Sequence, residues 1–83
     1  MSILRELLPT EEEFVEAVKN ALKRYKTYSA DDIEKMIKSE DGIMCIKDEY
    51  THDRNLFENG KITRNEFLNG GANAVAFNLD MTY

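Results

Sequence analysis

The chain has 83 residues, of which 42% are hydrophobic and 33% charged, and its net charge at pH 7 is −5. This length predicts one small domain over residues 1–83, and the composition excludes a disordered tail. The acidic charge argues against direct binding to nucleic acid or to an anionic membrane, because both repel an acidic surface. No apolar run in the sequence is long enough to span a bilayer.

The N-terminal stretch and the cysteine content bear on the compartment. The opening residues lack the long apolar segment of a secretory signal. Cys45 is the single cysteine, so it cannot form an internal disulfide, and this is typical of a reducing compartment. We therefore expect a cytoplasmic protein. An apolar patch precedes Pro9 and is expected to cover one end of the core; its members are Ile3, Leu4, Leu7 and Leu8.

The first long helix is expected over residues 10–26. Thr10 and Glu13 have the spacing of a capping box, and the acids that follow Thr10 suit the N-terminal end of a helix dipole. An apolar stripe recurs at helical spacing, and it consists of Phe14, Ala17, Val18, Ala21, Leu22 and Tyr25. The change from acidic to basic residues along this stretch favours a helix, and a binding role for the glutamates is the alternative.

A second helix is expected over residues 30–40. Ser29 and Asp32 have the spacing of a variant capping box, and the apolar stripe that follows is Ile33, Met36 and Ile37. We expect Asp41–Gly42 to end this helix.

The third element, residues 43–58, is less regular. Its apolar stripe is Ile43, Ile46, Tyr50 and Phe57, but Asp53 falls in the same stripe where an apolar residue is expected. We therefore allow a helix break near Thr51–Asp53.

The fourth helix is expected over residues 64–80, opened by a capping box of Thr63 and Glu66. No charged residue occurs from Phe67 to Leu79, so we expect this helix to be buried on more than one side. Gly70–Gly71 would permit close helix packing or a break into two helices, and a hinge or a groove for a partner is the alternative. Four such helices with short connections predict an all-α protein, a small compact helical bundle.

Residues 55–67 resemble one half of an EF-hand. With Gly60 at the sixth loop position, Asn55 falls first, Asn59 fifth and Glu66 twelfth, where the family places oxygen ligands for calcium. The third position is Phe57, which cannot ligate. A turn followed by a capping box explains the same residues, so a degenerate EF-hand-like metal module is a remote alternative.

Few residues could carry chemistry. Cys45, Glu49 and His52 share one face of a continuous helix, and thiolate, carboxylate and imidazole groups all ligate zinc. No second cysteine or histidine exists, so we expect no metal site and no cofactor. Cys45 and His52 lie about 10 Å apart along a helix, too far for direct activation. With no phosphate loop or nucleophile elbow, we expect no catalytic residues and no enzyme.

The remaining features favour a protein-binding module. Carboxylates spaced along helices can imitate phosphate charge, and tyrosine is enriched in interfaces. The candidate partner-binding residues are Glu11, Glu12, Glu16, Tyr28, Asp31, Asp32, Glu34, Glu40 and Asp41.

In size and charge the chain resembles the small acidic proteins of phages and mobile elements, such as anti-CRISPR and anti-restriction inhibitors. That resemblance implies an inhibitor that docks, as a nucleic-acid mimic, on a basic nucleic-acid-binding surface of a partner protein. The alternative is a structural or assembly module that forms a small homo-oligomer through its uncharged last helix.

Overall fold

The computed structural model describes residues 7–25 and 27–82, and these residues form helices without any strand. In chain order the helices are α1 (Glu11–Lys23), α2 (Ala30–Lys38), α3 (Glu40–Glu58), α4 (Arg64–Glu66), the π-helix η1 (Phe67–Gly71) and α5 (Ala72–Thr82). Because α4, η1 and α5 follow one another without a gap, they make one long helix. The predicted all-α class, with a bundle of about four helices, is confirmed. The predicted roles of Ile3 and Leu4 lie outside the described residues.

The predicted capping boxes form at the starts of α1, α2 and α4. Thr10 Oγ1 accepts from the backbone N–H of Glu13 at 3.1 Å, and the Glu13 carboxylate accepts from the backbone N–H of Thr10 at 3.1 Å. Ser29 makes the same exchange with Asp32 at the start of α2, as Thr63 does with Glu66 at the start of α4. Each box satisfies two backbone N–H groups that a helix start would otherwise leave unpaired.

The corner between α2 and α3 differs from the prediction that Asp41–Gly42 ends the second helix. α2 already ends at Lys38, and Ser39 is the N-cap of α3, where its Oγ accepts from the Gly42 N–H at 3.0 Å. Gly42 is a point of close approach, because a Cβ atom there would lie 2.0 Å from the carbonyl oxygen of Met36. The glycine therefore permits a tight corner and does not end a helix.

The predicted third helix is confirmed, and the break that the sequence allows near Thr51–Asp53 does not occur, since α3 runs without interruption from Glu40 to Glu58. Asp53 occupies a buried position of the apolar stripe, with 5% of its surface exposed. The helix tolerates this acid because the Asp53 carboxylate has a hydrogen-bond partner in His52. Ile43, which the stripe includes, is instead 56% exposed near the start of α3.

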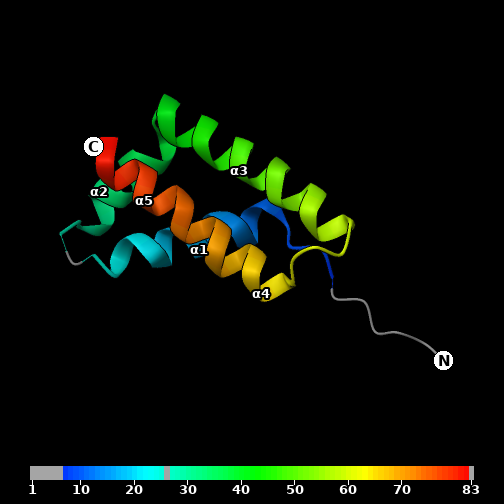
Figure 1. The fold of residues 1–83 in the computed structure, drawn as a ribbon. Coiled ribbons are helices and arrows are strands. Elements are labelled where there is room, and N and C mark those ends of the chain that lie inside the picture. Colours follow the sequence, from blue (N-terminus) through cyan, green and yellow to red (C-terminus); the bar gives the residue numbers. More distant parts are fainter. Residues whose placement is uncertain (1–6, 26, 83) are drawn as a thin grey trace.

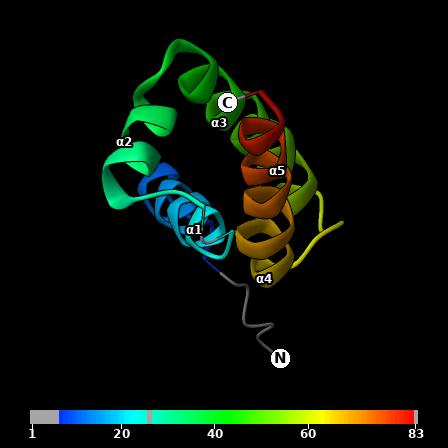
Figure 2. The same ribbon diagram turned by 90° about the vertical axis from the view of Figure 1, so that its left-hand side faces the viewer.

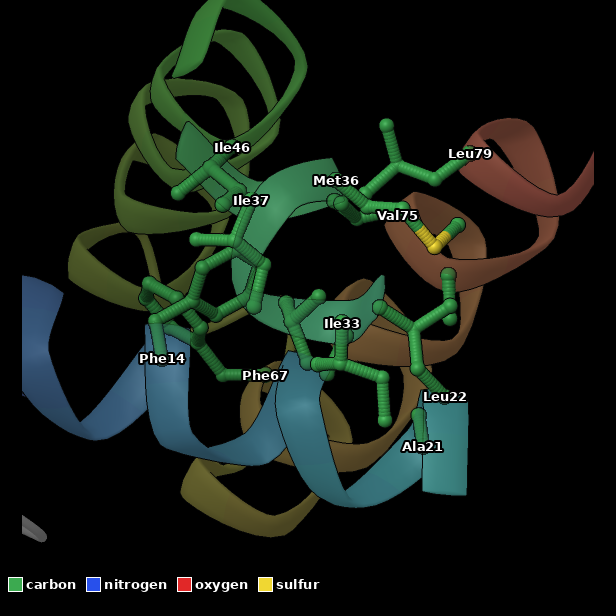
Figure 3. Close-up of a cluster of buried hydrophobic side chains, with 13 residues drawn as sticks. Phe14, Ala21, Leu22, Ile33, Met36, Ile37, Ile46, Phe67, Val75 and Leu79 are labelled. Atoms are coloured by element: carbon green, nitrogen blue, oxygen red, sulfur yellow. The ribbon is translucent and has the colours of Figure 1, made fainter. Parts of the chain in front are cut away.

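The four long helical segments surround one core. Figures 1 and 2 show α5 beside α1, with α2 and α3 completing the bundle. Figure 3 shows side chains from these helices meeting in the space between them, and the buried apolar residues are Phe14, Val18, Ala21, Leu22, Ile33, Met36, Ile37, Ile46, Phe67, Ala72, Val75, Ala76 and Leu79.

One end of the core is aromatic. The ring of Phe67 lies 5.7 Å from that of Phe14, 5.4 Å from that of Tyr50 and 6.0 Å from that of Phe57, between ring centroids. The Tyr50 hydroxyl donates to the Pro9 carbonyl at 2.6 Å, which holds the segment before α1 against α3. Such edge-to-face contacts fix the position of η1 relative to α1 and α3.

The last helix is not buried on more than one side within the described chain, contrary to expectation. Its inner side supplies the buried residues Ala72, Val75, Ala76 and Leu79. On its outer side Phe77 is 56% exposed and Met81 is 69% exposed. The absence of charge therefore does not reflect burial in this fold, because the outer side is also uncharged.

Candidate functional site

The glutamates at the start of α1 divide into one structural residue and three that face solvent. Glu13 closes the capping box and forms an ion pair with Arg64 at the start of α4. The Thr10 backbone N–H and the Arg64 guanidinium both lower the pKa of Glu13. Glu11, Glu12 and Glu16 form no ion pair within the described residues, so their charge remains available to a partner.

These three carboxylates line a surface hollow of about 520 Å³ together with Val15 and Lys19. A second hollow, of about 190 Å³, continues from Glu11 and Val15 toward Ile37, Lys38, Ile43 and Ile46. Together the two hollows place carboxylates that form no described ion pair next to half-buried Val15 of α1 and exposed Ile43 of α3. We call Glu11, Glu12, Val15, Glu16 and Ile43 the acidic groove.

Some of the other predicted partner-binding residues have partners within the fold. Asp32 belongs to the capping box of α2, and the Tyr28 hydroxyl donates to the Asp80 carboxylate. Glu34 lies 2.7 Å from Lys19 Nζ and 3.3 Å from Lys38 Nζ, and the bond to Lys19 is the main reason that its pKa is lowered. These residues stabilise the bundle, so their charge or hydroxyl group is less available for binding.

The remaining three predicted residues do not join the acidic groove. Asp31 lines a hollow that also contains Glu34, Lys35 and Lys38. Asp41 lines a separate hollow with Met36, Leu79 and Thr82, and Glu40 is exposed in the first turn of α3. The structure thus brings Glu11, Glu12 and Glu16 together at one hollow, places Asp31 and Glu34 at another, and leaves Glu40 and Asp41 outside both.

A second polar site lies where α3 meets the π-helix. Glu49 and Asp53 of α3 line a hollow of about 420 Å³ with Ile62, Asn65, Glu66, Asn69, Gly70 and Gly71. A Cβ atom on Gly71 would lie 2.0 Å from Asp53 Oδ2 and 3.1 Å from Phe14 Cε1. The buried Asp53 carboxylate therefore occupies the space that the missing side chain of Gly71 leaves, which explains why a glycine stands on this side of η1.

The carboxylates of Glu49 and Asp53 share this site with one imidazole. Burial and a hydrogen bond with Asp53 raise the pKa of Glu49 to about 7, so the Glu49 carboxyl holds a proton at mildly acidic pH. His52 Nδ1 lies 3.0 Å from Asp53 Oδ1, and this bond raises the pKa of His52. One ligand atom from each of these residues falls within 4.8 Å of the other two, close enough to share a proton or a cation.

The sequence indicates this site only in part. Glu49 and His52 share a helix face as predicted, but the third member is Asp53, and Cys45 lies near Asn78 Nδ2 at 3.9 Å. Burial raises the pKa of the Cys45 thiol. The sequence does mark Asp53, because it is an acid at a position of an apolar stripe. The π-helix gives no comparable signal, because it depends on packing against α3 and α1.

The EF-hand resemblance covers a different structure in this fold. Asn55 and Phe57 belong to α3, which runs to Glu58, and only residues 59–63 connect α3 to α4. Gly60 adopts a left-handed backbone with φ of 70° in this turn. The connection is shorter than the 12-residue loop of the EF-hand family.

Comparison with protein families, curated proteins and solved structures finds no match to the chain. Within residues 7–25 and 27–82, no helix combines the length and the apolar character that crossing a membrane requires.

Proposed function

We propose that this chain is a non-catalytic binding module whose acidic groove docks on a basic surface of a partner protein. The observation that carries this proposal is the position of Glu11, Glu12 and Glu16, which form no ion pair with any described residue and border half-buried Val15 and exposed Ile43. A basic side chain of a partner could pair with these carboxylates while an apolar neighbour packs on Ile43. The attraction between opposite charges would speed association and favour basic partners, and the apolar contact at Ile43 would add affinity.

The class of partner follows from the same chemistry. Closely spaced carboxylates present negative charge as a nucleic-acid backbone does, so a basic surface that binds nucleic acid suits the acidic groove. Occupying such a surface would inhibit a nucleic-acid-processing enzyme. The single half-buried cysteine, Cys45, suits the reducing conditions of the cytoplasm, where we place this activity.

The test is affinity capture from a lysate of the source cell with the purified chain as bait, at low and at high salt. We expect a nucleic-acid-processing enzyme that is held at low salt and released at high salt, because salt screens exposed charges. The purified enzyme should then lose activity when the chain is added in excess.

Two double variants with equal charge changes sharpen this test. Glu12→Gln with Glu16→Gln removes two carboxylates from the acidic groove and should abolish capture. Asp48→Asn with Glu58→Gln removes two exposed carboxylates of α3 outside the groove and should leave capture unchanged. Capture that survives the first variant, or that is lost equally with both, would contradict the proposed interface.

The remote EF-hand alternative has its own test. An ion that binds the folded chain raises its melting temperature in proportion to occupancy. We expect melts with calcium and with chelator to coincide, because Phe57 stands at a ligand position and lies in α3. A melting temperature that rises with calcium concentration would favour the metal module over the binding module.

A further inference from the structure

The outer side of the last helix carries an apolar row that nothing in the described chain covers. Phe77 is 56% exposed, Met81 is 69% exposed, and Gly70 and Ala74 are also exposed. Figures 1 and 2 show α5 on the outside of the bundle, with no described segment lying over this side. We call Gly70, Ala74, Phe77 and Met81 the outer row.

The spacing of the outer row is that of a helix–helix contact. From Ala74 to Met81 its steps of three and four residues keep the members on one side of α5, as the a and d positions of a coiled coil do, and Gly70 precedes them by four residues at the end of the π-helix. Gly70 and Ala74 make one half of the row small, and Phe77 and Met81 make the other half large. An antiparallel copy would place Phe77 over Ala74 and Met81 over Gly70, so the row is complementary in shape to itself.

Charge indicates what covers the row. The chain carries a net charge of −5, so two copies repel each other over most of their surfaces. From Phe67 to Leu79 there is no charged residue, and Asp80 is half-buried with its carboxylate bound to the Tyr28 hydroxyl. Along Ala74, Phe77 and Met81 a basic partner would find no charged side chain to pair with, whereas Gly70 borders the hollow that Glu49, Asp53 and Glu66 line. The part of the outer row on α5 therefore adds no charge repulsion to the approach of a second copy.

We infer that the outer row is the contact surface of a homodimer in which two last helices pack antiparallel about a twofold axis. This inference does not depend on the acidic groove, which lies on α1 and α3. The row is about 16 Å long at 1.5 Å per residue, so it covers less than the roughly 800 Å² per partner of a standard interface. The dimer is accordingly weak, with a dissociation constant roughly in the micromolar range.

Sedimentation equilibrium over a wide concentration range tests the inference. We expect the mass to rise from monomer toward dimer, and we expect added salt to strengthen the dimer because it screens the repulsion between two acidic chains. Binding to a basic partner would weaken with salt, so the two interactions respond in opposite directions. A mass that stays monomeric up to millimolar concentration would overturn the inference and leave the proposed function untouched.

A matched pair of variants locates the surface. Phe77→Glu introduces a charge at the centre of the row and should raise the dissociation constant about 30-fold or more, as expected for a hot-spot residue. Met44 of α3 has the same exposure, 56%, and lies outside both the outer row and the acidic groove, so Met44→Glu should leave dimerisation unchanged. Dimerisation that survives Phe77→Glu, or that Met44→Glu weakens equally, would place the contact elsewhere.

Gly70→Gln separates association from folding. A Cβ atom at Gly70 would meet no atom within 4 Å in the single chain, so the monomer leaves room for a side chain to begin there. In the dimer the same side chain would meet Met81 of the second copy. We expect a weaker dimer together with an undiminished melting temperature at low concentration, and an unchanged dissociation constant would contradict the close contact at Gly70.

Cross-linking tests the antiparallel arrangement. In a Cys45→Ser background, a mixture of Gly70→Cys and Met81→Cys chains is treated with a short thiol-to-thiol cross-linker. The antiparallel dimer predicts products that join position 70 to position 81. Products that join only like positions would overturn the antiparallel arrangement.

Discussion

Helices α1 and α5 lie side by side and bury apolar residues in the same core, yet their outer sides differ. α1 exposes Glu11, Glu12 and Glu16, whereas the outer row of the last helix has no charge. Core packing requires only the inner sides, so it explains neither outer side. The difference suggests that the outer sides determine which partner each helix binds. The carboxylates of α1 suit a basic partner, and the uncharged outer row suits a second copy of the chain.

Two phenylalanines provide the strongest contrast between these helices. Phe14 of α1 is fully buried and Phe77 of α5 is 56% exposed. Phe14→Ala should lower the free energy of unfolding by about 3–5 kcal/mol because it leaves a cavity among the aromatic rings. Phe77→Ala should change it by less than about 0.5 kcal/mol at concentrations where the chain is monomeric.

Urea unfolding measures both effects. Because a chain this small has only about 5 kcal/mol of stability to lose, Phe14→Leu serves as a milder variant that remains folded. Equal losses for the variants at Phe14 and Phe77 would mean that the buried side of α1 and the outer side of α5 do not differ in packing as described.

The adjacent glycines of the π-helix provide a second contrast, between the inner and outer sides of one helix. Gly71→Ala should destabilise the fold by about 1–3 kcal/mol, because its Cβ would displace the buried Asp53 carboxylate and press on Phe14. Gly70→Ala should stabilise it by up to about 1 kcal/mol, because alanine favours a helix and meets no neighbour. At low protein concentration the melting temperatures of the two variants should shift in opposite directions. A shift in the same direction would contradict the placement of Gly71 on the inner side and Gly70 on the outer side of the helix.

Much of this fold could be predicted from local sequence signals. The capping boxes at Thr10, Ser29 and Thr63 depend on residues three positions apart, so the sequence shows them directly. Long-range packing explains the failures. Gly42 permits a close approach to Met36, and Asp53 remains in an unbroken helix because Gly71, distant in sequence, leaves room for its carboxylate.

The candidate site was predictable to a smaller degree for the same reason. The three glutamates of the acidic groove are close in sequence and share a helix, so their proximity is a local property. Whether Ile43 lies beside them depends on how α3 packs on α1. The pairing of Glu34 with Lys19 is likewise a contact between helices, which local spacing does not show.

The site at Glu49 predicts how stability depends on pH. The pKa of Glu49 rises from 4.5 to about 7 on folding, so its contribution to stability is complete below pH 4.5 and is lost as the pH rises to 7. The raised pKa of His52 acts in the same direction at higher pH. The lowered pKa values of Glu13 and Glu34 contribute stability above pH 4.5 and lose it only below that value.

The urea midpoint should therefore fall as the pH rises from about 5 to 8. Glu49→Gln keeps a neutral hydrogen-bonding group beside Asp53 and should remove most of the fall below pH 7. A midpoint that rises over this range, or a fall that the variant retains in full, would contradict the raised pKa of Glu49.

The smallest expected loss of stability concerns the N-caps at the starts of α1 and α4. Thr10→Ala and Thr63→Ala each remove a hydroxyl that accepts a backbone N–H at 3.1 Å. Each variant should lose about 1 kcal/mol of unfolding free energy, whereas Thr51→Ala, at an exposed position inside α3, should lose less. Equal losses at all three positions in urea unfolding would show that the caps contribute no more than an ordinary surface threonine.

The most direct test of the two outer sides is a pair of titrations followed by backbone amide NMR spectra. On dilution, we expect resonance shifts at Gly70, Ala74 and Phe77, with α1 unchanged. On addition of a short polylysine peptide at low salt, we expect shifts at Glu11, Glu12 and Glu16, with the outer row unchanged. Dilution shifts confined to α1, or peptide shifts confined to the outer row, would contradict the assignment of the two surfaces.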